Sequence, residues 1–246
     1  MSLNLYSYLR EGLRVAVCKS FPDMEVSSCS IPLFFKSPSP SADLNTPIAL
    51  RISSIKKMSP EIAANSIVSC FDWNEKYIIS DLQNHETVTE GFICFRTSLS
   101  FQYETLKKAA GNAPQPLETL CNLKLPDKTL ELLHQTAPLL RYSETALSSG
   151  FIFEPIHFSL LNSSQERKLI RLIAVSQTEE LYSSGAAAFF WQELTRLLSC
   201  YLNRIPIFNA NEELTLSRVT LVRACHNRIV SLCKHIYISN RAEKLD

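Results

Sequence analysis

The chain has 246 residues, of which 46% are hydrophobic and 20% are charged, enough for a packed core in one large or two ordinary domains. Its 25 basic side chains are almost balanced by 24 acidic ones, which excludes a strong overall field for nucleic acid and leaves only a local basic patch. Positive charge gathers near the C-terminal end: residues 217–246 carry six basic and two acidic side chains, whereas residues 61–150 carry seven basic and eleven acidic ones.

Eight cysteines are spread along the chain without a Cys-x-x-Cys pair or a close Cys/His cluster, so neither a disulfide framework nor a zinc site is predicted. Free cysteines of this kind are typical of a reducing compartment. The first residues, MSLNLYSYLREGLR, contain no basic leader followed by an apolar run, and no apolar segment approaches the roughly 20 residues that cross a bilayer. We therefore expect a cytoplasmic protein that does not contact membranes.

The first half of the chain is expected to be mixed α and β, because helical spacing and alternating β-branched runs follow one another. The expected elements are, in chain order, a helix at 3–20, strand-like pieces at 25–35, a turn-rich loop at 36–47, helices at 48–57 and 60–71, strands at 77–82 and 88–97, and a helix beginning at Ser100.

The segment 55–62, IKKMSPEI, contains a Lys-Met-Ser run that is part of an ATP-binding signature in one class of aminoacyl-tRNA synthetases. However, Ser59 is a good N-cap, Pro60 suits the first helical position, and Glu61 favours the positive end of the helix dipole. An ATP loop would need basic or hydroxyl residues where Pro60 and Glu61 stand. We interpret the segment as the start of a helix.

The second half is expected to be helical and to follow a linker that begins GNAPQP. Ser163 and Glu166 form a capping box at the start of one of its helices. The expected helices are 127–137, one beginning at Pro138 and ending near 148, one beginning at 163, 186–203 and 214–236. This gives an α+β protein with a mixed N-terminal domain at 1–110, a linker at 111–126 and an all-α bundle at 127–246.

The last of these helices has two faces at 100° per residue. The apolar stripe consists of Leu221, Val222, Cys225, Ile229, Leu232, Cys233 and Ile236. The opposite, polar face consists of Thr220, Arg223, Asn227, Ser231 and Lys234. Such a face is either solvated with no partner or suited to phosphates. Arg218 falls on the apolar stripe, where packing of its aliphatic stem is expected.

Two parts of the chain resemble arginyl-tRNA synthetases. Residues 55–68 (IKKMSPEIAANSIV) and 90–95 (EGFICF) are similar to the N-terminal additional domain, in which a strand carries Gly-Phe-Ile-Asn-Phe. Residues 164–173 (SQERKLIRLI), 201–207 (YLNRIPI) and 214–236 are similar to the DALR anticodon-binding domain, with Arg218, Leu221 and Ala224 in register. The resemblance covers roughly 1–108 and 130–246 and implies the fold of both domains.

The resemblance also implies candidate tRNA-contacting residues. In the family the strand faces the D-loop, so Phe92 would stack on a base, worth about 1–3 kcal/mol, while Cys94 replaces the base-reading amide with a weak donor. The alternative is that this strand is simply core. In the second part Tyr201 corresponds to a residue near the anticodon, and Arg223, Asn227 and Lys234 supply the polar face.

Several departures from the family weaken anticodon specificity. Leu202 stands where the family has an aromatic residue, and Thr215 replaces the arginine of the DALR run. A further basic face, formed by Arg167, Lys168 and Arg171, is either ordinary surface or a second contact.

The catalytic centre of the family is missing. About twenty residues join the two matched parts, where the synthetases have a catalytic domain with a His-x-Gly-His motif, and five glycines leave no phosphate-cradling loop. We therefore expect no catalytic residue, no metal and no cofactor. Three hypotheses stay open: a tRNA-binding protein, with arginine isoacceptors as the first candidates; a protein–protein adaptor of a tRNA-modifying enzyme or synthetase; and an enzyme of its own kind.

Overall fold

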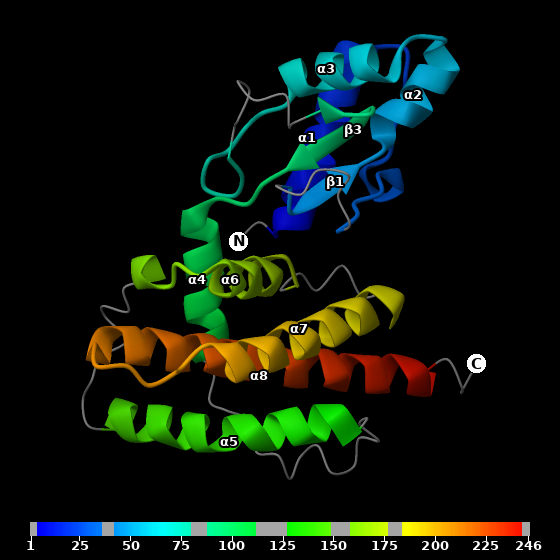
Figure 1. Ribbon diagram of the computed structural model, residues 1–246. Helices are drawn as coiled ribbons and strands as arrows, with labels where there is room; N and C mark the ends of the chain where they lie inside the picture. The colour runs from blue at the N-terminus through cyan, green and yellow to red at the C-terminus, as the bar shows by residue number, and fades with distance from the viewer. Residues whose placement is uncertain are drawn as a thin grey trace. The chain divides into compact units, whose positions relative to one another are not determined.

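The computed structural model describes residues 4–35, 42–79, 88–111, 127–148, 158–176 and 184–242. The chain forms two compact units, Met1–Phe101 and Gln102–Asp246. Helices dominate, with one small antiparallel sheet, so the predicted α+β class is confirmed (Figure 1). The division falls inside helix α4 (Leu99–Gly111), earlier than the expected end of the first domain, and all but the first residue of the expected linker lies outside the described residues.

Three helices of the first unit confirm the sequence expectation: α1 (Leu5–Ser20), α2 (Ile48–Lys56) and α3 (Pro60–Cys70). The α1 helix begins after Asn4, whose side chain accepts a hydrogen bond from the Tyr6 backbone N–H at 3.2 Å. α3 packs against both α1 and α2. Pro60 occupies the first turn of α3 as predicted, although the N-cap side chain before it makes no capping hydrogen bond.

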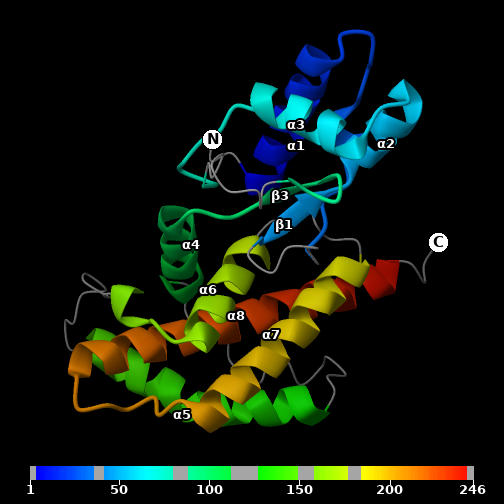
Figure 2. The same ribbon diagram turned by 45° about the horizontal axis from the view of Figure 1, so that its top comes forward.

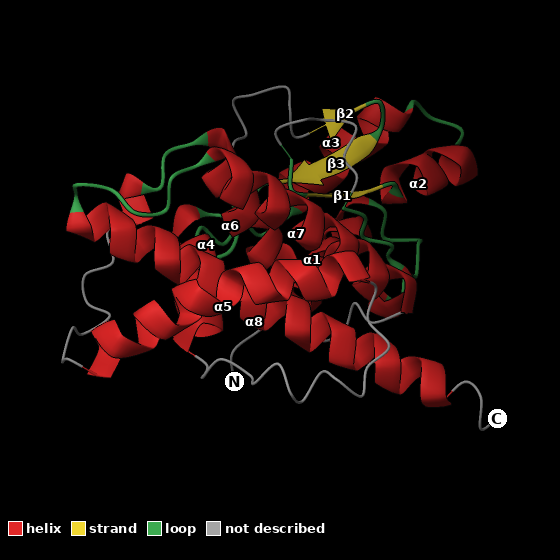
Figure 3. Ribbon diagram, turned by 60° about the horizontal axis from the view of Figure 1, so that its bottom comes forward, coloured by secondary structure: helices red, strands yellow, loops and turns green. Residues whose placement is uncertain are grey.

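The sheet has the strand order β1-β3-β2, with β1 (Leu44–Thr46) and β2 (Val88–Thr89) each antiparallel to the central β3 (Phe92–Phe95), as Figure 3 shows in yellow. Two expectations were wrong here. The loop expected at 36–47 contains β1, because pairing with β3 and complete burial outweigh its weak strand propensity. The single strand expected at 88–97 is a hairpin, because the chain turns at its middle.

The hairpin turn consists of Glu90 and Gly91, both with positive φ, at 52° and 79°. A two-residue turn of this kind matches the right-handed twist of the strands beside it. A Cβ on Gly91 would lie 2.5 Å from Pro60 Cβ and 2.7 Å from Leu50 Cδ2. The turn therefore packs directly on α2 and α3, and glycine is needed for that approach as well as for the backbone angle.

Two other segments expected as strands form isolated bridges in their described parts. Within 25–35, Phe34 pairs with Asn45, and a short 3₁₀ turn, η1 (Ser28–Ser30), comes before it. Within 77–82, Ile78 makes a single bridge, and the last three residues lie outside the described residues.

The described part of the second unit is helical. Besides α4 it consists of α5 (Asp127–Ser148), η3 (Phe158–Leu160), α6 (Ser164–Ser176), α7 (Ser184–Arg204) and α8 (Glu212–Ala242). The long helix α8 packs against α5, α6 and α7 and is the centre of the bundle (Figures 1 and 2). Every residue of α8 from 219 to 230 is buried, because neighbours cover it on several sides.

One helix in this unit replaces two expected ones. α5 continues through Pro138, at which the sequence pattern predicted a helix start. Pro138 and His134 are both exposed, so water can bond to the carbonyl that loses its helical N–H partner. No helix in the described ranges is both long and apolar enough to cross a bilayer.

Candidate nucleic-acid interface

The two candidate residues of the first unit lie on the central strand β3. Cys94 is 5% exposed and its backbone pairs with Asn45 of β1, so its thiol lies in the core rather than at a surface that could contact a base. Phe92 is partly exposed, next to the hairpin turn, and its backbone pairs with Thr89. Of the two, Phe92 alone keeps a surface on which a base could stack.

Tyr201, the candidate near the anticodon, is completely buried on α7. Its hydroxyl donates to Glu166 Oε1 at 3.1 Å. Burial, and secondarily the carboxylate beside it, raises the pKa of the Tyr201 hydroxyl well above its ordinary value. Tyr201 is therefore a structural residue, and its ring is not available to a nucleotide.

The polar face expected on α8 is mostly not at the surface. Arg223 is 4% exposed and Asn227 is 9% exposed, so the expectation of a solvated face that could meet phosphates was wrong for both. The Asn227 amide donates to the Ala109 carbonyl at 2.9 Å, which satisfies a carbonyl in the last turn of α4. The amphipathic periodicity did not predict which residues are exposed, because a central helix is covered by neighbours on its polar side too. Lys234, beyond the buried stretch, is partly exposed.

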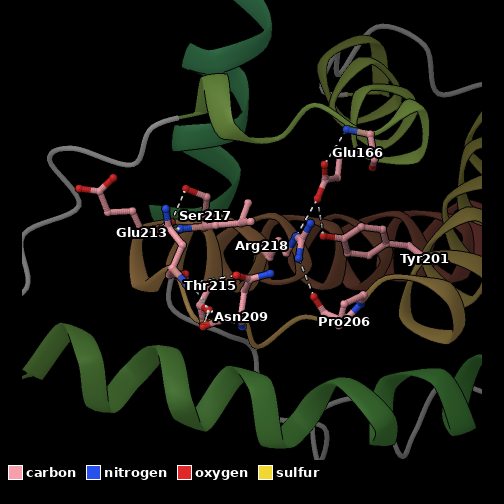
Figure 4. Close-up of polar contacts among 11 residues, drawn as sticks. Glu166, Tyr201, Pro206, Asn209, Glu213, Thr215, Ser217 and Arg218 are labelled. Carbon is pink, nitrogen blue, oxygen red and sulfur yellow. Dashed lines mark hydrogen bonds and ion pairs between the residues drawn. The ribbon is translucent and has the colours of Figure 1, made fainter.

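The chemistry of this unit is concentrated in a buried network around Glu166, at the start of α6 (Figure 4). The predicted capping box is confirmed: the Ser163 N–H donates to Glu166 Oε2 at 2.9 Å, and the Glu166 N–H donates to Ser163 Oγ at 3.1 Å. The other carboxylate oxygen, Oε1, accepts from Tyr201 and from Arg218 Nε at 3.0 Å. One carboxylate thereby joins α6, α7 and α8.

Arg218 is part of this network, whereas the sequence suggested that its aliphatic stem packs on the apolar stripe. Its Nη1 donates to the Pro206 carbonyl at 2.7 Å, so the side chain also holds the segment between α7 and α8. Its side chain is 12% exposed and that of Glu166 is 1% exposed. A buried pair with all of these hydrogen bonds made is a structural device, and neither partner is placed to react with a ligand.

The same segment is held at a second point. The Thr215 hydroxyl accepts from the Asn209 N–H at 2.9 Å, at the start of α8 (Figure 4). Because Thr215 lies in the first turn of α8, its hydroxyl holds the segment before this helix to the helix start.

The exposed side of α6 is basic. Arg167 and Lys168 are exposed and Arg171 is partly exposed; we call these three residues the α6 basic face. The helix contains one acidic residue, Glu166, which is buried and ion-paired. The positive end of the helix dipole lies in the same turn as Arg167 and Lys168. This surface therefore presents positive charge with no acidic residue of its own helix beside it.

The comparisons with known proteins add no relative: no family model, no curated protein and no solved structure matches the chain. Among the described residues there is also no group of three or more His, Cys, Asp or Glu side chains that could hold a metal ion. A function for this chain therefore has to be argued from its sequence motifs and from the α6 basic face.

Proposed function

We propose that this chain is a catalysis-free RNA-binding protein that holds tRNA for another factor, such as a tRNA-modifying enzyme. The motifs shared with arginyl-tRNA synthetases suggest tRNA as the RNA, with arginine isoacceptors first. In this proposal the two units correspond to the N-terminal additional domain and to the DALR anticodon-binding domain. The protein acts in the cytoplasm, which is supported by the free thiols of Cys18, Cys70, Cys94, Cys200, Cys225 and Cys233.

The α6 basic face is the observation that carries the proposal. Phosphate contacts supply most of the affinity of non-specific RNA binding, and they need exposed cations that are not neutralised by neighbouring acids. Arg167 and Lys168 are exposed in the first turns of α6, whose one acidic residue is buried and ion-paired, whereas Arg223, which the sequence favoured, is buried. The proposal therefore moves the main contact from α8 to α6.

The test is binding of pooled, fluorescently labelled tRNA at low salt. The variant Arg167→Gln, Lys168→Gln, Arg171→Gln removes three charges and is expected to weaken binding at least about tenfold, since each lost phosphate contact lowers the electrostatic contribution.

The matched control removes three exposed cations of the first unit, Arg51→Gln, Lys57→Gln and Lys76→Gln. It is expected to bind as the wild type does. Equal binding by the wild type and the α6 variant, or no binding by the wild type at low salt, would contradict the proposal. In the second case, RNase-resistant capture of a purified synthetase or modifying enzyme would favour the adaptor hypothesis.

A further inference from the structure

A groove runs between α5 and α7, which both pack against α8. Its volume is about 590 Å³, within the range of sites that hold small ligands. The residues along it are Glu131, Leu132, Gln135, Trp191, Gln192, Thr195, Arg196, Ser199, Cys200 and Asn203. Those of α7 recur at helical spacing over three turns, so the groove follows one side of that helix.

The walls of the groove combine flat or apolar surface with amide groups. Trp191 provides partly exposed surface against which a planar ring can pack. Gln135, Gln192 and Asn203 each carry an amide, which both donates and accepts and can bond the edge of a base through two hydrogen bonds. A planar heterocycle with donors and acceptors on its rim matches this set of groups.

The indole of Trp191 gives an independent indication of a ligand. Its Nε1 atom is buried and has no hydrogen-bond acceptor in the described part of the chain. A buried donor without an acceptor is unfavourable, and in native proteins such groups are few and are often satisfied by a water or a ligand. A turn of the indole toward the groove would let an acceptor atom on a ligand supply the missing partner.

The charges along the groove argue for an uncharged ligand group. Arg196 is the one cation among the lining residues, and its Nε donates to Glu193 Oε2 at 3.0 Å, so its charge is already balanced. Glu131 adds an acidic side chain on the opposite wall. A phosphate would meet no uncompensated cation among these residues. A neutral base carries no charge that has to be desolvated when it enters.

We propose that the groove between α5 and α7 binds one unstacked nucleobase. The idea that this base is part of the RNA bound by the α6 basic face rests on the proposed function. The idea that the groove binds a nucleobase does not depend on it. Free nucleosides, which carry no phosphate, are therefore the probe.

The experiment uses the fluorescence of Trp191, one of two tryptophans in the chain. In the variant Trp73→Phe it is the sole indole, and titration with adenosine, guanosine, cytidine and uridine is expected to quench its emission saturably with at least one of them. Adding Gln192→Leu is expected to weaken that nucleoside about tenfold, by loss of its hydrogen bonds. Asn65→Leu, an exposed amide of the first unit, is the matched control and is expected to change nothing.

Circular dichroism of each variant establishes that it is folded. Quenching by no nucleoside, or equal affinity in the Gln192→Leu variant, would overturn the inference. The α6 triple variant separates the two proposals: it is expected to lose tRNA and keep nucleoside binding. If nucleosides bind and tRNA does not, the groove inference stands and the proposed function fails; if tRNA binds and no nucleoside quenches Trp191, the groove inference fails alone.

Discussion

At the scale of single residues, Glu166 has the most consequential surroundings in the second unit. Its carboxylate is buried, caps its own helix through Ser163, and accepts hydrogen bonds from Tyr201 and Arg218. A buried charge is tolerated when its partners are in place, and removing one partner leaves the other charge uncompensated. The stability of the network is therefore expected to depend on the charge of Glu166 as well as on the shape of its side chain.

We predict that Glu166→Gln lowers the free energy of unfolding of the second unit by about 3 kcal/mol, because Arg218 loses its counter-charge. Tyr201→Phe, which removes one hydrogen bond to the same carboxylate, should cost less, about 1.5–2 kcal/mol. Urea denaturation followed by Trp191 emission in the Trp73→Phe background measures both. Equal losses in the two variants would show that the charge has no special role.

Cysteine reactivity gives a second prediction for single residues. Burial raises the pKa of the Cys233 thiol to about 12 and that of Cys225 further still. At pH 8 both are therefore thiols, and a raised pKa means less of the reactive thiolate. Iodoacetamide on the native protein should label the partly exposed Cys18, Cys70 and Cys200 and leave Cys225 and Cys233 intact, as read by peptide mass spectrometry. Rapid native labelling of Cys225 would contradict the buried position of α8.

At the scale of elements, the hairpin between β2 and β3 joins backbone geometry to packing. Glu90 adopts a left-handed conformation that costs a non-glycine residue about 1–2 kcal/mol, somewhat less for asparagine. Gly91 has the same requirement and in addition lies against Pro60 and Leu50. Adjacent positions of one turn thus have opposite tolerance for change.

We predict that Glu90→Asn raises the free energy of unfolding of the first unit by about 0.5–1 kcal/mol, since Asn-Gly is the preferred pair for such a turn. Gly91→Ala should lower it by about 1–3 kcal/mol, because the new Cβ overlaps neighbouring atoms and the backbone angle is strained. Trp73 emission in a Trp191→Phe background reports on this unit. A neutral Gly91→Ala variant would show that the turn does not pack on α2 and α3.

At the scale of the whole molecule, the 25 basic side chains are nearly balanced by 24 acidic ones. Any RNA binding therefore depends on a local group of cations and not on the net charge. A uniformly charged protein would show a steep salt dependence, whereas here the dependence should reflect the few cations that touch phosphate. The α6 basic face contributes three of them.

We predict that the logarithm of the tRNA association constant falls with the logarithm of salt concentration with a slope of about −2 to −3, as three phosphate contacts imply. In the α6 triple variant the slope should approach zero, while the control triple variant of the first unit should keep the wild-type slope. A slope that does not change in the α6 variant would place the contacts elsewhere on the molecule.

Local features of the sequence determined much of the secondary structure. The leucine spacing of α1, the Pro60 start of α3 and the Ser163–Glu166 capping box depend on residues within one or two turns of each other, and all were predicted. The errors at β1 and Pro138 have the opposite cause: strand pairing across fifty residues and the exposure of one helix side are not visible in a local pattern.

The sequence by itself therefore determined most of the helices, the capping box at the start of α6 and the α+β class. Only the tertiary structure decided which polar side chains stay at the surface. Arg223 and Asn227 have the same helical spacing as a solvated face, but α8 is covered by its neighbours, and the Asn227 amide donates to a carbonyl inside the unit. The Glu166–Arg218 pair likewise joins residues fifty-two positions apart, and no periodicity within one helix could have predicted it.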